Sequence, residues 1–425
     1  MKKRDYDYIR KHFFFKYPED KLAKEFLEFK GADCYSDNLT NHGKTTTHIL
    51  NHFTHEVQYR AKHSSANYSP VEVLYNDELL DRAFAQVDSH PRFYSMRVTE
   101  EKRLAKLGIT PENDPETYWS RINLSDINEL HRFFSNASWV RKASQFSPIV
   151  ARNLYESYAP YFGGVIHDSS RGWNARMLGA LASNYDYKYL GTDPNTRLQE
   201  TAVEMSNWIQ DIAWQQRRDK VDLRCIGSEV FVPEWEGTAD FSFTSPPYFD
   251  LEIYSDEDTQ SIHVGGGDSY ENWLTYFVYP TVENTYKYLK PGRFYCYNLK
   301  NLKTHNGKRY IFNDWLAVAL ECGFVLKKVR KMHHQSKRQF GKDKNGQFKV
   351  ESGEINYNAD LEPLAVLYKP LPEERVTTKT EDYFYKTWYN KPLMDKVRPE
   401  GFEVKIPKIY TEFLNEKFDS FNKQR

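Results

Sequence analysis

Two short apolar segments, each ending on an aspartate and separated by a helix, constrain the fold of this chain more than any other feature. Gly164–Asp168 and Lys188–Asp193 have the pattern of strands, and Ala175–Ala182 has that of a helix. A strand, a helix and a further strand in this order form a right-handed crossover between parallel neighbours. The pattern therefore predicts an α/β fold with Asp168 and Asp193 at the carboxyl edge of the sheet, where such folds bind ligands.

The turn between the first strand and the helix suits a nucleoside cofactor. Asp193 can accept hydrogen bonds from both hydroxyls of a ribose. The turn and the start of the helix offer unpaired backbone N–H groups to a carboxylate. An ordinary βαβ unit without a ligand is the alternative interpretation.

The stretch Ala239–Glu252 combines a buried strand with an abrupt polar corner. Asp240–Thr244 is apolar and aromatic, and the strand must stop where prolines can no longer donate to a ladder. The corner is formed by Ser245, Pro246, Pro247 and Tyr248. A planar base can stack on Tyr248 while its exocyclic amine donates to the Ser245 hydroxyl and the Pro246 carbonyl. The corner indicates a nucleobase pocket, and a strand that simply enters a loop is the alternative.

This corner resembles the catalytic tetrapeptide of the S-adenosylmethionine-dependent amino-methyltransferases of DNA, which carry Asp, Asn or Ser, then two prolines, then an aromatic residue. Their cofactor motif is usually Asp-x-Phe-x-Gly-x-Gly, and here it reads Asp168-Ser-Ser-Arg-Gly-Trp-Asn174. Gly172 matches, Ser170 replaces the aromatic residue and Asn174 replaces the last glycine. Asn tolerates left-handed backbone angles better than most residues, so we expect the turn to form.

The run from Gly172 to Leu181, followed by Gly191-Thr-Asp-Pro-Asn195, is also similar to proposed methyltransferases of phages and plasmids. The resemblance implies that S-adenosylmethionine is held by Asp168, Ser170, Gly172 and Asp193. It also implies that Ser228 or Glu229 accepts a hydrogen bond from the adenine amine. For Glu229, an ordinary surface position without a ligand is an equal alternative.

The resemblance spans residues 144–370 and implies a Rossmann-like class I methyltransferase sheet, mostly parallel with one antiparallel strand. Phe324–Leu326 and Leu364–Tyr368 would form the closing antiparallel hairpin. Residues 1–143 have the spacing of a mostly helical region that could recognise DNA or a partner, and residues 371–425 form a charged C-terminal tail.

The activity implied is direct methyl transfer to the exocyclic amine of a DNA base, with no metal and no covalent enzyme intermediate. Serine at the first corner position favours cytosine N4 slightly over adenine N6. Cysteine-based C5 methylation is disfavoured, because no Pro-Cys pair occurs in the catalytic segment. The alternatives are an RNA or small-molecule methyltransferase of the same fold, and a catalytically silent nucleic-acid-binding protein, which the departures at Ser170 and Asn174 would allow.

DNA contact must come from a local patch, because the chain has 59 basic and 59 acidic residues and no net charge. The insertion 327–349 holds nine Lys or Arg residues, with Asp343 as its single acid. Such a concentration indicates phosphate binding, and a solvated loop is the alternative. The basic residues that we expect to contact DNA are Lys331, Lys337, Arg338 and Lys342.

Metal, membrane and disulfide chemistry are not expected. His48, His52 and His55 fall on one helical face, but their order matches no metalloenzyme motif, so we expect solvated or capping histidines. The four cysteines are far apart, and the apolar runs are shorter than the roughly 18 residues of a membrane span. We therefore expect a soluble cytoplasmic protein, of unknown oligomeric state, with reduced thiols.

Overall fold

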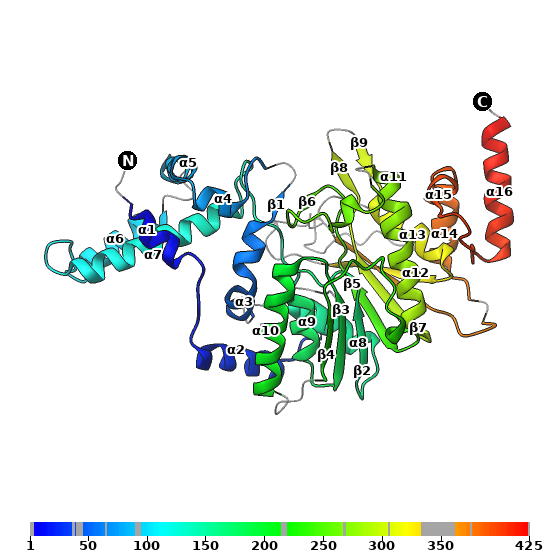
Figure 1. Ribbon diagram of the computed structural model, residues 1–425, viewed down its shortest axis with the longest axis horizontal. Helices are drawn as coiled ribbons and strands as arrows, with labels where there is room; N and C mark the ends of the chain where they lie inside the picture. The colour runs from blue at the N-terminus through cyan, green and yellow to red at the C-terminus, as the bar shows by residue number, and fades with distance from the viewer. Residues whose placement is uncertain are drawn as a thin grey trace, which may run out of the picture. The chain divides into compact units, whose positions relative to one another are not determined.

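The computed structural model describes residues 4–35, 39, 46–63, 66–89, 95–213, 219–266, 269–304, 307–332, 362–374 and 376–423 (Figure 1). The chain divides into two compact units. The first consists of Met1–Leu22, Thr47–Ser144 and Asp250–Asp256. The second consists of Ala23–Thr46, Gln145–Phe249 and Glu257–Arg425.

The first unit is built mainly from helices, as the sequence predicts for the N-terminal region. They are α1 (Tyr6–His12), α3 (Thr47–Arg60), α4 (Pro70–Leu74), α5 (Asp77–Ser89), α6 (Ser95–Lys106) and α7 (Pro115–Phe134), and α2 (Glu19–Gly31) begins here. The strands β1 (Lys62–His63) and β6 (Glu252–Ile253) pair antiparallel in this unit. Its core includes Phe13, Tyr59 and Phe134. The helical ends follow from capping, since the Asp114 side chain accepts from the Thr117 N–H at the start of α7 (3.1 Å).

The second unit is organised around a mixed sheet. In the described part of the chain its strands are β2 (Gly164–Asp168), β3 (Tyr187–Thr192), β4 (Val221–Arg224), β5 (Ala239–Thr244), β7 (Leu289–Asn298), β10 (Val325–Met332) and β11 (Glu362–Tyr368). Their order is β10-β11-β7-β5-β2-β3-β4. The strands from β4 to β7 pair in parallel, and β11 is antiparallel to both of its neighbours. This confirms the predicted Rossmann-like sheet with one antiparallel strand, and also the predicted closing hairpin.

Helices cover both sides of this sheet, which explains why β5 is buried at all six positions. Figure 1 shows α9 (Ala175–Leu181) and α10 (Thr196–Ala213) on one side, with α12 (Tyr279–Tyr288) and α13 (Ile311–Glu321) on the other. The helix α8 (Pro148–Tyr158) packs on α9. The hairpin of β8 (Leu302–Thr304) and β9 (Gly307–Arg309) follows β7, and short 3₁₀ turns lie at Pro233–Trp235 and Ser261–His263.

The segment Trp273–Leu289 differs from its sequence pattern, which predicts one helix stopped by Lys290-Pro-Gly292. The structure has α11 (Tyr270–Trp273), a π-helical turn (Leu274–Val278) and then α12. The expected stop is a bulge inside β7, where Ala239 pairs with Leu289 and Phe241 pairs with Phe294. A proline that cannot donate and Gly292 at φ +76° make this irregularity favourable.

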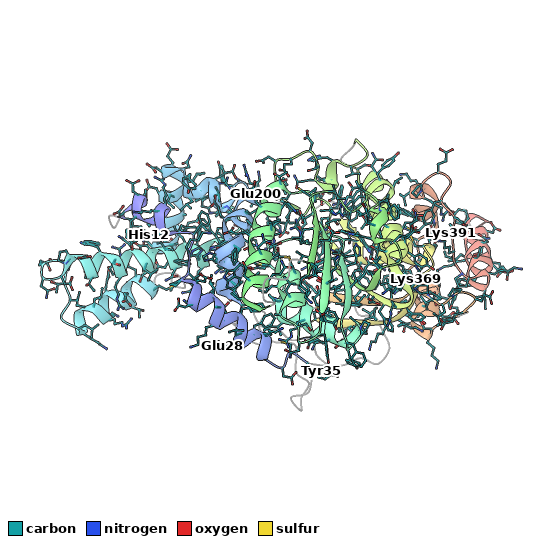
Figure 2. The ribbon with its side chains drawn as sticks, turned by 60° about the horizontal axis from the view of Figure 1, so that its bottom comes forward. His12, Glu28, Tyr35, Glu200, Lys369 and Lys391 are labelled. Carbon is teal, nitrogen blue, oxygen red and sulfur yellow. The ribbon has the colours of Figure 1, made fainter. Side chains whose placement is uncertain are left out.

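Lys369, labelled in Figure 2, ties the end of β11 to the end of α12. Its ammonium donates to the carbonyls of Tyr286 and Leu289, both at 2.6 Å. These are carbonyls that a helix end leaves without internal partners. Burial lowers the pKa of Lys369 to about 8.

The segment predicted as a charged tail folds into helices in the described residues: α14 (Lys379–Thr387), α15 (Lys391–Val397) and α16 (Lys408–Lys423). Glu321 at the end of α13 is fully buried and attaches this segment. Its carboxylate accepts from Arg398 (2.8 and 2.9 Å), from Tyr279 (2.7 Å) and from Tyr389. A buried carboxylate requires such partners, so the attachment is specific.

The contact between α8 and α9 leaves no room for a side chain at Gly179. An added Cβ would lie 2.7 Å from the Pro148 carbonyl oxygen. We expect Gly179→Ala to lower the free energy of unfolding by about 1–3 kcal/mol, because the helices must separate. Gly31→Ala is the matched control, since nothing lies within 4 Å of its added Cβ. Urea titrations of both variants measure the difference, and equal stabilities would contradict the tight packing.

Candidate active site

The cofactor turn and the catalytic corner lie on adjacent strands. β2 pairs in parallel with β5, with Ile166 opposite Phe241 and His167 opposite Ser242. Parallel neighbours end at the same edge of a sheet, so the turn after Asp168 and the corner after Thr244 share the carboxyl edge. The structure thus brings together the two motifs that the sequence separates by more than 70 positions.

Asp168 is fully buried at the end of β2, and protein groups occupy its carboxylate. Oδ2 accepts from Arg176 Nε (2.7 Å) and from the Tyr189 hydroxyl (2.6 Å), and Oδ1 accepts from the Ser170 N–H (3.1 Å). Arg176 also donates to the Ser170 carbonyl. This bonding gives Asp168 a positioning role, because it holds the first residues of the turn and the start of α9.

The turn itself contains two left-handed residues, Gly172 at φ +57° and Asn174 at φ +61°. The Asn174 N–H donates to the Gly172 carbonyl at 2.8 Å. The asparagine in place of the usual glycine is therefore accommodated, as its tolerance of left-handed angles predicts. Ser170, in place of the aromatic residue, is partly buried within the same turn.

Asp193 follows β3 and lies beside this turn, and the residue as a whole is partly exposed. Oδ2 accepts from the Gly172 N–H (3.0 Å) and Oδ1 accepts from the Asn195 N–H (3.1 Å). Burial raises the pKa of Asp193, while the charge of Arg171 and these two N–H bonds oppose that rise. Each oxygen retains a lone pair, so the carboxylate can still accept from ligand hydroxyls.

Arg171 is a residue that the sequence reasoning missed. Its side chain is buried, and Nη2 donates to Gln199 on α10 (2.9 Å). Nε and Nη1 have no partner among the described residues. The signal available in the sequence is an arginine immediately before the motif glycine, at a position that the family motif leaves variable.

Ser228 and Glu229, the two candidates for the adenine contact, differ in their bonding. The Ser228 hydroxyl is buried and bonded to the Thr281 hydroxyl at 2.8 Å. Glu229 folds back against Gly227, and its Oε2 is buried without a partner among the described residues. Burial also raises the pKa of Glu229. Glu229 therefore retains the acceptor that an adenine amine would need.

The corner combines a serine hydroxyl that bonds to no described residue with a partly exposed tyrosine. Ser245 is half-buried and makes no hydrogen bond to any described residue. Pro246 is buried, while Pro247 and Tyr248 are partly exposed. Phe249 follows in a left-handed conformation and is buried. The corner thus places a hydroxyl without a described partner and a partly exposed tyrosine at the carboxyl edge.

The basic insertion is described only at its beginning. Lys331 lies in β10, opposite Pro363 of β11, and is partly exposed. Lys337, Arg338 and Lys342 lie outside the described residues. Phosphate contact by these four side chains remains a prediction.

The first unit has features of its own. His55 is buried among aromatic rings instead of solvated, with its ring 4.9 Å from that of His131, and burial lowers the pKa of both.

Within the described ranges, no group of three or more His, Cys, Asp or Glu side chains could hold a metal ion, and no helix is long and apolar enough to cross a membrane.

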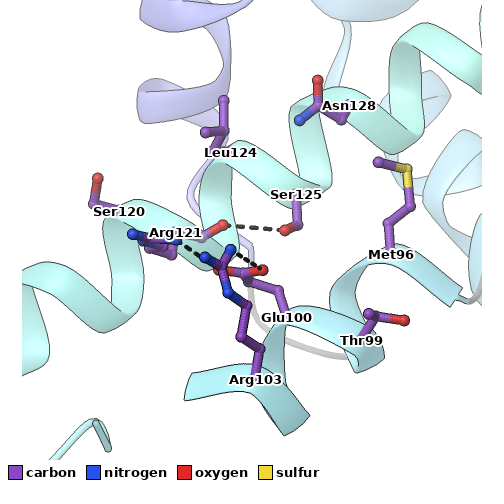
Figure 3. A pocket seen from close by; sticks show the side chains of 9 residues that line it. All are labelled: Met96, Thr99, Glu100, Arg103, Ser120, Arg121, Leu124, Ser125 and Asn128. Atoms are coloured by element: carbon purple, nitrogen blue, oxygen red, sulfur yellow. Dashed lines mark hydrogen bonds and ion pairs between the residues drawn. The ribbon is translucent and has the colours of Figure 1, made fainter. Parts of the chain in front are cut away.

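A cavity of about 460 Å³ lies between α6 and α7 in the same unit (Figure 3). Glu100, one of its lining residues, forms ion pairs with Arg121 (3.2 Å) and Arg103 (3.5 Å). None of the predicted site residues lines this cavity. It is lined by Met96, Thr99, Glu100, Arg103, Ser120, Arg121, Leu124, Ser125 and Asn128.

No protein-family model matches this sequence, and no curated protein matches it. Among solved structures, it is similar to a TehB-like SAM-dependent methyltransferase from Corynebacterium glutamicum (14% identity, 53% of this chain, 90% of that chain, TM-score 0.31). It is also similar to geranyl diphosphate C-methyltransferase from Streptomyces coelicolor (12% identity, 60% of this chain, 86% of that chain, TM-score 0.34). Likenesses at this level identify no family and no substrate.

The sheet itself is the stronger observation. Within the described residues it is mostly parallel with a single reversed strand, as in a Rossmann-like α/β fold. This is the fold class that the cofactor turn and the corner predict.

Proposed function

We propose that this protein transfers a methyl group from S-adenosylmethionine to the exocyclic amine of a DNA base, with cytosine N4 slightly favoured over adenine N6. The observation that carries the proposal is the adjacency of two motifs. The Ser245–Tyr248 corner and the Asp168–Asn174 turn follow neighbouring parallel strands and share one edge of the sheet. A methyl donor held at the turn would lie beside a base held at the corner.

The residues at the turn fit this cofactor. Asp193 is partly exposed and can accept from the ribose hydroxyls, and the unpaired Oε2 of Glu229 can accept from the adenine amine. The bound cofactor supplies an electrophilic methyl group. Both assignments match acceptors of the protein with donors of the cofactor. The measured affinity for S-adenosylhomocysteine tests them.

The corner can activate an amine. The lone pair of an exocyclic amine is delocalised into the ring, so the nitrogen is a poor nucleophile until its hydrogens are bonded to acceptors. The free Ser245 hydroxyl and the Pro246 carbonyl would accept these hydrogens and favour tetrahedral nitrogen. Tyr248 would stack on a base that has been flipped out of the duplex.

Mass spectrometry of digested DNA tests the proposal directly. DNA from a host that lacks N4-methylcytosine and N6-methyladenine should gain one of these bases when the protein is expressed, and should gain it far more slowly with Ser245→Ala. Methylated RNA with unmodified DNA would support the RNA alternative. DNA binding without affinity for S-adenosylhomocysteine would support a silent binding protein.

The cofactor assignment has its own test. Asp193→Ala should weaken binding of S-adenosylhomocysteine by on the order of 1.5–3 kcal/mol, because a charge-assisted contact to the ribose is lost. Glu200→Ala is the matched control, since Glu200 is an exposed acid on α10 (Figure 2). Calorimetry measures both variants, and an unchanged affinity of Asp193→Ala would contradict the assignment.

A further inference from the structure

Phe249, the residue after the corner, has an unusual backbone conformation. Its φ is +59°, and only 4% of the residue is exposed. Bulky L-residues rarely adopt the left-handed region, because the Cβ atom approaches the backbone. Such a conformation persists only where the surrounding structure holds it, and it occurs preferentially at functional sites.

The Phe249 ring is held from several directions. It lies edge-to-face with Tyr270 (5.5 Å between centroids) and tilted against the buried Trp273 (5.7 Å), both on α11. The guanidinium of Arg309, on β9, lies 4.7 Å from its centroid. Arg309 also lies 5.6 Å from the Tyr270 ring. Edge-to-face and cation–π contacts both restrict the orientation of a ring. The Phe249 ring is therefore restricted in its orientation as well as buried.

A buried hydrogen bond supports this arrangement. The Tyr270 hydroxyl donates to Asp314 Oδ2 at 2.7 Å, and Asp314 lies in the first turn of α13 with 5% exposure. The Phe249 seat, defined as Tyr270, Trp273, Arg309 and Asp314, therefore combines groups from α11, β9 and α13. These residues follow Phe249 by 21 to 65 positions in the sequence.

We propose that Phe249 is a positioning residue for methyl transfer, which the seat locks so that the Ser245 hydroxyl and the Tyr248 ring keep their places. The left-handed residue redirects the chain directly after Tyr248, and the seat holds that redirection. This inference rests on the proposed function, and it adds a determinant that the tetrapeptide does not contain. Misplacement of a reacting group by about 1 Å can cost about 10²-fold in rate.

Three substitutions separate positioning from stability. Phe249→Ala removes the ring and keeps the backbone strain. Phe249→Gly removes the ring and relieves the strain, because glycine adopts positive φ freely. Phe249→Tyr keeps the ring. We expect Phe249→Gly to have a higher Tm than Phe249→Ala, while both lower kcat by about 10²-fold. Phe249→Tyr should remain within about threefold of the parent, and KM and the Kd of S-adenosylhomocysteine should change little in all three.

If Phe249→Gly recovers the parental kcat, the ring is not needed for positioning and the proposal is wrong. Hydrogen exchange of a peptide spanning residues 244–252 provides a readout that needs no substrate. Exchange should accelerate in Phe249→Ala and Phe249→Gly and stay at the parental level in Phe249→Tyr. Unchanged exchange in all three would overturn the positioning role. Loss of the proposed function alone would appear differently, as a parent protein that methylates no DNA.

Discussion

Ser245→Ala is expected to lower the single-turnover rate of methyl transfer by about 10²-fold while leaving the affinity for S-adenosylhomocysteine unchanged. The Ser245 hydroxyl is half-buried and bonded to no described residue, so it is available to an amine. Its contact would strengthen as the nitrogen becomes tetrahedral, which is when a preorganised acceptor lowers the barrier most. Rapid-quench measurements on substrate DNA give this rate, and calorimetry gives the affinity.

Tyr248 provides the matched comparison. Tyr248→Ala removes a stacking face worth about 1–3 kcal/mol per base, so it should weaken capture of the flipped base as well as slow transfer. Tyr248→Phe keeps the face and should retain most activity. The fluorescence of 2-aminopurine at the target position reports base flipping separately from chemistry. A parental rate in Ser245→Ala, or a Tyr248→Phe variant as slow as Tyr248→Ala, would contradict the chemistry proposed for the corner.

Asp168→Asn is expected to lower the free energy of unfolding by about 3–5 kcal/mol, the largest effect on stability that we predict. The substitution leaves the Arg176 guanidinium, which is 4% exposed, without its charged partner in the protein interior. Removing one member of a buried ion pair costs far more than removing both, because the remaining charge keeps its desolvation penalty. Urea titration of the parent and the variant measures the loss.

The double variant Asp168→Asn/Arg176→Met is the control for this prediction. It removes both charges, so its stability should exceed that of Asp168→Asn. An equally unstable double variant would show that the hydrogen bonds of Asp168 to Tyr189 and Ser170 matter more than the ion pair.

Much of the second unit could be predicted from local pattern. The segments Gly164–Asp168 and Asp240–Thr244 are short apolar runs bounded by glycine or proline, and both are strands in the sheet. The spacing of Ala175–Ala182 predicted α9. The order strand, helix, strand implies parallel neighbours and so placed Asp168 and Asp193 at one edge, as the structure has them.

Other features depend on contacts that no local pattern contains. The carboxylate of Asp168 is bonded to Arg176 and Tyr189, and its role in holding the cofactor stays a prediction. The unit boundaries are a second case, since Asp250–Asp256 belongs to the first unit through the pairing of β6 with β1. The bonding of Asp168 and the boundary of the first unit both depend on residues that become neighbours only when the chain folds.

The amino-acid sequence by itself determined several strands of the sheet, the helix between the first two and the residue types at the corner, because these depend on backbone preferences and on side-chain types within a few residues. Only the tertiary structure decided which polar groups are occupied and which remain free. Ser245 keeps an unbonded hydroxyl, Glu229 keeps an unpaired oxygen, and Phe249 is held in a left-handed conformation by a seat formed far along the chain. Hydrogen bonding and burial depend on distances across the packed interior, and those distances exist only after the strands and helices have assembled.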